Sequence, residues 1–188
     1  MNKKMLPLVA AIAGSLLLTA CAGSNAKSDN DMMATEANLN NQDMYEVHEE
    51  SRIYVFDDRA TYESFLEVGE TSYRKVHIGE GPKGETLVFG LTSEDKKKTS
   101  GIASIDMYDG ELSGAEEFYG EMRMEGRIYV FQSLEEMNQA RIVGEVPLRY
   151  TDIGAGPEGE TVVYALNGSN KKHKPVELMK KFNMMNAN

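Results

Sequence analysis

The stretch Arg52-Ile53-Tyr54-Val55-Phe56 recurs 75 residues later as Arg127-Ile128-Tyr129-Val130-Phe131. Its β-branched and aromatic side chains are typical of a buried strand. The same shift lays Ile78–Thr86 on Ile153–Thr161, and 18 of the 41 positions from 52 to 92 are identical without a gap. Similarity at one fixed spacing indicates an internal repeat, so we expect a duplicated unit.

The residues after each of these strands predict a helix with defined ends. Asp57 or Asp58 in the first copy, and Ser133 in the second, can accept hydrogen bonds from the first free N–H groups of a helix. Gly69 and Gly144 stand where such a helix would end in the left-handed conformation. The repeat therefore predicts one helix at the same place in each copy.

Two more strands follow the helix in each copy. In the first copy they cover residues 73–78 and 85–91, around a loop rich in Gly and Pro. Each unit thus reads β-α-β-β, and residues 45–50 and 120–125 predict either a leading strand or an extension of the first one. A unit of about 50 residues buries too little surface to be stable alone. We expect an α+β fold in which two tandem β-α-β-β units pack as one pseudo-twofold domain.

The segments around the two units complete the predicted organisation. Pro175 can start a short helix through Phe182, with Val176 and Met179 on the same face. The stretch before the first unit is dominated by Asn, Asp, Ser and Ala and is typical of a flexible tether. The predicted parts are a signal peptide (1–20), a tether (21–43), a first unit (44–98), a connector (99–118), a second unit (119–174) and a helix with a tail (175–188).

Charge and cysteine content exclude several classes of protein. The 188 residues carry 20 Lys+Arg and 30 Asp+Glu, which gives a net charge of −10. Binding of nucleic acid starts from clustered positive charge, so nucleic acid is not an expected partner. The chain has one cysteine, Cys21, which excludes an intramolecular disulfide and a cysteine-rich metal cage.

The N-terminus resembles the signal of a bacterial lipoprotein. Lys3 and Lys4 precede an uncharged run, Met5–Ala20, which is shorter than the roughly 20 apolar residues of a membrane-spanning helix. The run ends in Leu18-Thr19-Ala20-Cys21, which is similar to a lipobox. The resemblance implies cleavage before Cys21 and attachment of lipid to its thiol. The alternative is an ordinary secretory signal that ends near a cysteine.

This resemblance also implies a location in the cell envelope. Removal of residues 1–20 takes away two lysines and leaves 18 basic and 30 acidic side chains, a net charge of −12. Membrane attachment would then depend on the lipid anchor or on a local basic patch. Ala22 follows the cysteine, and in Gram-negative lipoproteins the absence of Asp there favours the periplasmic face of the outer membrane. The duplicated domain resembles uncharacterised proteobacterial lipoproteins. This resemblance does not indicate what activity the domain has.

Two glycine-rich loops match a nucleotide-binding pattern in spacing alone. Gly79-x-Gly81-x-x-Gly84 and Gly154-x-Gly156-x-x-Gly159 both have the spacing of a dinucleotide-binding loop. That mechanism needs a helix after the loop, whereas Glu85–Phe89 predicts a strand. We therefore expect the glycines to supply positive φ angles in a hairpin, and we expect no cofactor.

Histidines and acidic residues give no recognisable metal site. His48, His77 and His173 lack the spacing of metal ligands. Asp106 and Asp109 lack the alternating ligands and the final Glu of a calcium loop. We therefore expect no metal site, and we expect the histidines to lie on the surface or on edge strands.

Two glutamates stand out because both copies keep them beside the glycine loop. Glu85 and Glu160 occupy equivalent positions, and we expect each to form an ion pair across strands or between copies. The candidate partners are the arginines at strand ends: Arg52, Arg74, Arg127 and Arg149. Acid–base catalysis by paired carboxylates is the alternative interpretation.

Two basic clusters, Lys96–Lys98 and Lys171–Lys174, occupy matching positions in this acidic chain. They could contact anionic lipid headgroups or an acidic envelope polymer, or they could be solvated strand ends. The combined hypothesis is a lipid-anchored cell-envelope protein that binds or scaffolds without catalysis. Its expected partners are the membrane, through the lipid, and an envelope protein or polymer. An envelope hydrolase that uses paired carboxylates is the alternative.

Overall fold

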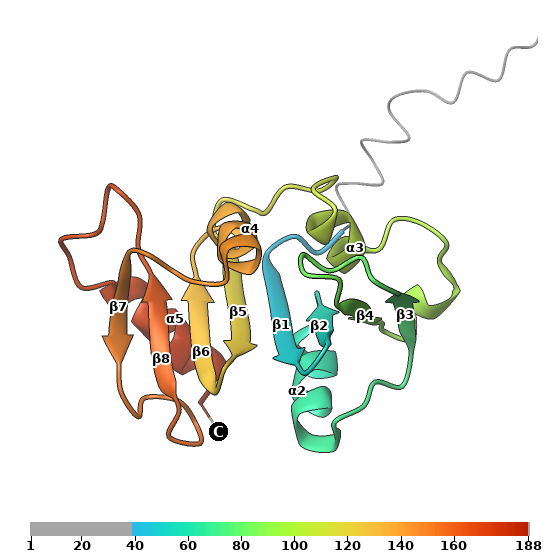
Figure 1. The fold of residues 1–188 in the computed structure, drawn as a ribbon, viewed down its shortest axis with the longest axis horizontal. Helices are drawn as coiled ribbons and strands as arrows, with labels where there is room; N and C mark the ends of the chain where they lie inside the picture. Colours follow the sequence, from blue (N-terminus) through green and yellow to red (C-terminus); the bar gives the residue numbers. More distant parts are fainter. Residues whose placement is uncertain (1–38, 188) are drawn as a thin grey trace, which may run out of the picture.

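The computed structural model describes residues 39–187, which form one eight-stranded sheet with four α-helices and a short 3₁₀ helix (Figure 1). The strands are β1 (Asp43–Glu49), β2 (Arg52–Phe56), β3 (Arg74–His77), β4 (Thr86–Gly90), β5 (Tyr119–Met124), β6 (Arg127–Phe131), β7 (Arg149–Asp152) and β8 (Thr161–Ala165). The helices are α2 (Arg59–Val68), η1 (Asp95–Lys97), α3 (Ala103–Tyr108), α4 (Leu134–Val143) and α5 (Val176–Met185).

The strand order is β3-β4-β2-β1-β5-β6-β8-β7, so the first four strands form one half of the sheet and the last four the other. We call the segments from β1 to α3 and from β5 to α5 the first and second halves. In the first half β2 pairs in parallel with β4, and Arg52 lies opposite Thr86. In the second half β6 pairs in parallel with β8, and Arg127 lies opposite Thr161. Parallel pairing of β1 with β5 joins the halves into one mixed α/β fold.

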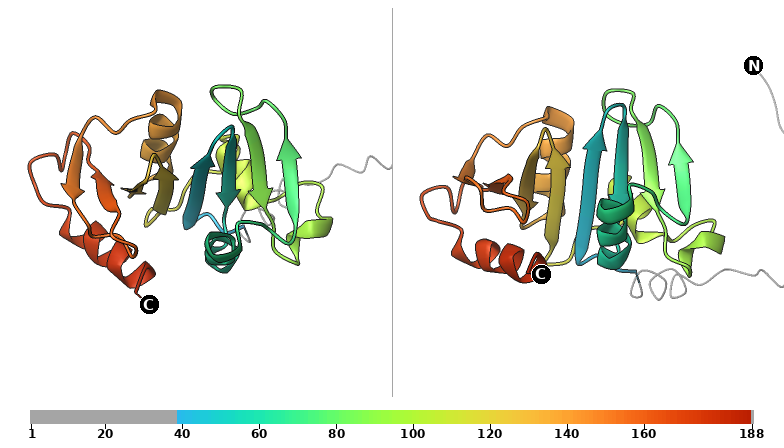
Figure 2. Two further views of the ribbon diagram at one scale, coloured as in Figure 1. Left: turned by 60° about the horizontal axis from the view of Figure 1, so that its bottom comes forward. Right: turned by 90° about the horizontal axis from the view of Figure 1, so that it is seen from below.

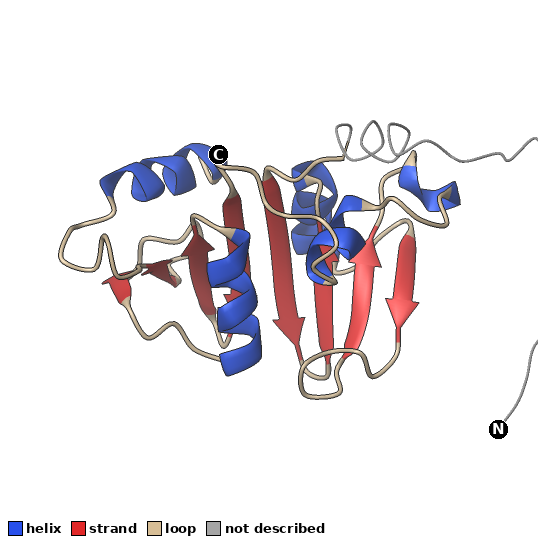
Figure 3. Ribbon diagram, turned by 90° about the horizontal axis from the view of Figure 1, so that it is seen from above, coloured by secondary structure: helices blue, strands red, loops and turns tan. Residues whose placement is uncertain are grey.

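The sheet has a hydrophobic core on each of its two faces. Ile53 and Val55 of β2 belong to the core that α3 and α4 cover. Ile128 and Val130 of β6 belong to the opposite core, which α2 and α5 cover (Figures 2 and 3). The same pentapeptide therefore presents the same side chains to opposite faces of one sheet.

The helix ends follow the sequence prediction. Asp58, rather than Asp57, caps α2 by accepting the N–H of Thr61 at 2.7 Å. Ser133 caps α4 through the N–H of Glu136 at 3.2 Å. Both helices end at glycines in the left-handed conformation, with φ of 77° at Gly69 and 83° at Gly144. These predictions are confirmed.

Several boundaries differ from the prediction. Residues 45–49 and 120–124 belong to leading strands, β1 and β5, which is one of the two predicted alternatives, so the unit is β-β-α-β-β. The connector contains α3, and the last tether residues, 39–43, include Leu39, which packs against a core, and the start of β1.

The predicted face of α5 is right in part. Phe182 is buried and Met179 packs against the same core, as predicted, whereas Val176 is 47% exposed and Leu178 is buried instead. Tyr164 of β8 contacts Phe182 edge-on, at 6.0 Å between ring centroids.

Candidate functional site at the junction of the two halves

Two fully buried glutamates lie side by side on the central strands where the halves meet. Glu46 is on β1 and Glu121 is on β5, 75 residues apart, and neither is exposed to solvent. Tyr45 lies opposite Glu121 in the parallel register, and Glu46 lies opposite Met122. Because side chains alternate along a strand, the two carboxylates point to opposite faces of the sheet.

Glu46 is paired with an arginine of the second half and with a histidine of its own strand. Arg141 of α4 donates its Nε–H to Glu46 Oε1 at 2.9 Å and also forms an ion pair with Oε1 through Nη2. His48 Nε2 lies 2.9 Å from Glu46 Oε2. Burial by itself would raise the pKa of Glu46, but the guanidinium and the imidazole together bring that pKa below its ordinary value. The guanidinium also stacks 4.1 Å from the centre of the Tyr108 ring.

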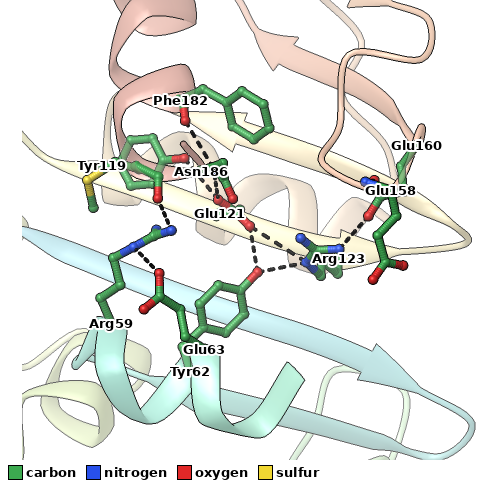
Figure 4. A network of polar contacts seen from close by, with 11 residues as sticks. Arg59, Tyr62, Glu63, Tyr119, Glu121, Arg123, Glu158, Glu160, Phe182 and Asn186 are labelled. Atoms are coloured by element: carbon green, nitrogen blue, oxygen red, sulfur yellow. Dashed lines mark hydrogen bonds and ion pairs between the residues drawn. The ribbon is translucent and has the colours of Figure 1, made fainter. Parts of the chain in front are cut away.

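Glu121 is satisfied mainly by hydroxyl and amide donors (Figure 4). Tyr62 of α2 donates its hydroxyl to Glu121 Oε1 at 2.5 Å. Tyr119 and Asn186 donate to Oε2 at 2.9 and 3.1 Å. Burial, followed by the nearby Glu121 charge, raises the pKa of both tyrosines well above the ordinary value, so both phenols remain protonated donors.

Arg123 and Arg59 extend this network to two other elements. Arg123 donates to the Tyr62 hydroxyl at 2.8 Å and to Glu160 Oε1 at 2.6 Å, and so connects α2 to the start of β8. Arg59 lies 2.8 Å from Glu63 and donates to the main-chain oxygen of Met185 at the end of α5. The first helix of the first half is therefore tied to the last helix of the chain.

These side chains line a cleft of about 750 Å³ between α2 and the C-terminal end of α5. Arg59, Arg123 and Tyr62 line the cleft together with Glu63 and Glu158. The mixture of guanidinium, phenol and carboxylate groups suits a polar ligand. The buried carboxylate beside the cleft accepts three hydrogen bonds and is not positioned as a free base or nucleophile.

The predicted glycine loops form tight connections between β3 and β4 and between β7 and β8. Gly79 and Gly84 have φ of 77° and 83°. The element that follows is a strand, as the sequence predicted, so the arrangement does not match a dinucleotide loop. A Cβ at Gly81 would lie 2.7 Å from Glu85 Oε2, and one at Gly156 would lie 2.4 Å from the equivalent atom of the second loop. The middle glycines therefore leave room for a glutamate.

The predicted pairing of those glutamates with strand-end arginines is wrong. Glu85 Oε2 accepts the N–H of Lys83 at 2.7 Å, and Glu160 Oε2 accepts the N–H of Glu158 at 2.8 Å. Glu160 also binds Arg123, whereas Glu85 forms no ion pair within residues 39–187. Each carboxylate closes its own loop because the backbone N–H groups lie within two residues of it.

The histidines are spread over the fold. His77 lies on the outer strand β3 at 3.1 Å from Glu80, and His173 is exposed, both as predicted. The prediction is wrong for His48, which is half-buried on the central strand β1 because it lies beside Glu46. Within the described part of the chain no three His, Cys, Asp or Glu side chains are grouped as metal ligands.

The basic clusters are partly engaged with their own surroundings. Lys96 lies 4.3 Å from the centre of the Tyr73 ring, and Lys98 pairs with Asp95 at 2.7 Å. In the second cluster Lys174 lies 5.4 Å from the centre of the Tyr150 ring. Some of the lysines that could bind an anionic partner therefore already contact side chains of the protein itself.

Cys21, the predicted signal and most of the predicted tether lie outside the described residues. Within residues 39–187, no helix is long and apolar enough to span a membrane. No protein-family model matches the sequence, and neither a curated protein nor a solved structure shows significant similarity to it.

Proposed function

We propose that this is a lipid-anchored cell-envelope protein whose domain binds or scaffolds a partner without catalysis. The observation that carries the proposal is the saturation of both buried carboxylates. Glu46 is held by Arg141 and His48, and Glu121 by three donors. A catalytic acid or base needs a free position facing its substrate, and these two groups are used to join the halves instead.

We also infer that the halves arose by duplication and are related by a pseudo-twofold axis that runs along the strands between β1 and β5. The strand order reads the same from both edges once equivalent strands are exchanged. The registers Arg52–Thr86 and Arg127–Thr161 differ by 75 residues in both members. An axis along the strands exchanges the two faces, which accounts for α2 and α4 covering opposite sides.

The location follows from the lipobox-like residues Leu18-Thr19-Ala20-Cys21. Acyl chains on Cys21 would hold the domain at the membrane, since several chains together give stable anchoring. In a Gram-negative cell we place it on the periplasmic face of the outer membrane. The mature net charge of −12 supports attachment through lipid rather than through a basic surface.

In-cell crosslinking of the anchored protein, followed by mass spectrometry, tests the binding role. The expected result is reproducible capture of one envelope component by the wild-type chain and reduced capture by Cys21→Ser, which lacks the anchor. Absence of any captured component, together with turnover of an envelope substrate that Glu63→Gln or Glu158→Gln abolishes, would instead establish the hydrolase alternative.

A further inference from the structure

A second hollow lies on the outer part of the first half, away from the junction. It has a volume of about 500 Å³ and lies over β2, β4 and β3, beside the end of α2. Arg52 and Arg74 are exposed at its rim, and Tyr54, Val76 and Val88 contribute its apolar floor. We call this hollow the outer groove.

Most of the residues that line the outer groove are identical in the two halves of the sequence. Eight of its ten lining residues are identical 75 positions later, the exceptions being Thr71 and Val76, which are replaced by Val146 and Thr151. A neighbouring hollow of about 270 Å³ between α2 and residues 91–93 also has ten lining residues, and only two of these, Glu70 and Leu91, are identical. The sequence has therefore diverged around one hollow and remained the same around the other.

Packing does not account for the identical residues at the rim. Ile78 and Ile153 are 83% and 85% exposed, and Arg52 and Arg74 with their equivalents Arg127 and Arg149 are exposed as well. Within residues 39–187 none of these four arginines forms an ion pair with a carboxylate, although Arg149 donates to the main-chain oxygen of Val146 at 2.7 Å. Exposed side chains without such contacts have little influence on folding, so a shared ligand is the simpler reason for the identity of the other three arginines.

The geometry of the rim indicates an extended, acidic ligand. Arg52 on β2 lies opposite Thr86 and Arg74 on β3 lies opposite Gly90, so the two arginines flank β4 on its two sides. They are four residues, about 13 Å, apart along the strand direction and two strand spacings, about 10 Å, apart across it. An extended peptide that crosses β4 diagonally can place carboxylates at positions i and i+4 on the two guanidinium groups, because the long arginine side chains span the remaining distance, with the side chain at i+2 over the apolar floor.

The charge of the outer groove also favours an acidic ligand. Glu70 is the third charged residue of the outer groove, which leaves a net positive charge in a protein of net charge −10.

We propose that each half of the sheet binds an acidic, extended peptide segment of a partner protein, with carboxylates four residues apart on Arg52 and Arg74 in the first half and on Arg127 and Arg149 in the second. This proposal rests on the binding role and the duplication proposed above. The hollow is observed in the first half, and the second site is inferred from the eight identical lining residues, so the proposal predicts two sites per chain. Because Tyr54 and Tyr129 belong to opposite cores, the two sites face opposite sides of the sheet.

Calorimetric titration of the full lipidated chain in detergent tests the proposal, with the acetylated peptide Glu-Thr-Val-Thr-Glu as probe. The expected stoichiometry is two peptides per chain. The peptide Gln-Thr-Val-Thr-Gln lacks both carboxylate side chains, and Glu-Glu-Thr-Val-Thr carries them on adjacent residues. Each should bind at least tenfold more weakly.

Variants assign the two sites to the two halves. Arg52→Gln/Arg74→Gln and Arg127→Gln/Arg149→Gln should each reduce the stoichiometry from two to one, and the combined variant should bind no peptide. Lys171→Gln/Lys172→Gln removes the same charge outside the grooves and should keep two sites. All of the changed side chains are exposed, but Arg149 also donates to the main-chain oxygen of Val146. The Arg52→Gln/Arg74→Gln variant should unfold at the wild-type urea concentration, and urea denaturation of the variants that carry Arg149→Gln shows that they are folded.

Three results would overturn the peptide proposal. The first is peptide binding with the same affinity in the combined arginine variant as in the wild type, or with the same affinity for all three peptides. The second is arginine-dependent binding of polygalacturonate or of phosphatidylglycerol nanodiscs without binding of the peptide, which would assign the grooves to a polysaccharide or a lipid. The third is in-cell capture of a partner that is unchanged in the combined arginine variant, which would retain the binding role and reject these grooves.

Discussion

At the scale of single residues, the ion pair of Glu46 with Arg141 joins the two halves inside the protein. A buried ion pair adds little net stability, but removal of one partner leaves an unpaired charge and typically destabilises by about 3–5 kcal/mol. Replacement of both partners by apolar residues is often neutral. The pair is therefore most informative when its members are changed one at a time.

Arg141→Met should lower the free energy of unfolding by about 3–5 kcal/mol. The double variant Glu46→Leu/Arg141→Met should recover most of that loss. Urea denaturation followed by circular dichroism measures both. A single variant as stable as the wild type would contradict the burial of Glu46 against α4.

Asp57 should make the free energy of unfolding depend on pH. Burial raises the pKa of its carboxyl from 3.8 to about 6, with the charges of Asp95 and Asp58 adding to the effect. Between about pH 4 and pH 6 the folded chain keeps a proton that the unfolded chain has lost, so this group reduces stability as the pH rises through that window. Two pKa units correspond to about 3 kcal/mol.

Asp57→Asn cannot ionise and still offers an oxygen to the N–H of Ser104, which Asp57 accepts at 3.1 Å. The variant should match the wild type near pH 4 and exceed its stability by up to about 3 kcal/mol above about pH 6.5. Urea denaturation at a series of pH values gives the difference. Parallel profiles for the two chains would show that Asp57 is not a buried acid.

The burial of Glu46 could not be predicted from its surroundings in the sequence. Tyr45-Glu46-Val47 alternates apolar and polar residues, which is typical of a strand with one solvated face. That face is covered by α4, whose Arg141 lies 95 residues away, and an alternating pattern does not encode so distant a contact. The one available sign was that Glu46 and Glu121 are identical at the 75-residue spacing.

At the scale of elements, the glycine loops were predictable because their conformation depends on neighbouring residues in the sequence. A positive φ at Gly79 and Gly84 follows from the turn itself. The role of the middle glycine was not predictable, because it depends on the rotamer of a glutamate four residues later. No helix was predicted at α3. It has only six residues, and Ile102, which precedes it, has no side chain that can cap a helix, so neither a long periodic pattern nor a capping residue marks it in the sequence.

Gly81→Ala should destabilise the first loop. The new Cβ would lie 2.7 Å from Glu85 Oε2 and 2.9 Å from Glu85 Cβ, so the carboxylate would lose the N–H of Lys83. Loss of a charged acceptor together with local strain should cost about 1–3 kcal/mol. Gly168→Ala is the matched control, since no heavy atom lies within 4 Å of its added Cβ.

Thermal unfolding of the two alanine variants distinguishes the clash with Glu85 from the general effect of replacing a glycine by alanine. The control should unfold at the wild-type temperature and Gly81→Ala several degrees below it. Equal unfolding temperatures would mean that the contact between Glu85 and the loop contributes nothing to stability.

At the scale of the whole molecule, the runs Ile53–Phe56 and Ile128–Phe131 are hydrophobic without alternation, which is typical of strands covered on both faces. This pattern agrees with the prediction of a buried strand in each half. It could not predict which helix covers which face, because α2 and α4 follow equivalent strands and yet lie on opposite sides.

Each half should need the other to fold. A fragment of residues 39–118 would leave Glu46 without Arg141 and β1 without β5. We expect this fragment to show no cooperative unfolding alone and to gain it on addition of residues 119–187. Far-UV circular dichroism with urea titration measures this, and a cooperative transition in the isolated fragment would contradict the role of the junction.

The central claim for the whole molecule is that a binding domain is held in the cell envelope by lipid on Cys21. Labelling of cells with radioactive palmitate, followed by membrane fractionation, tests it most directly with the wild type and Cys21→Ser. The expected result is a labelled wild-type chain in the membrane fraction and an unlabelled variant in the soluble fraction. A variant that is still labelled and still sediments with membranes, or a wild-type chain that takes up no palmitate, would contradict the account.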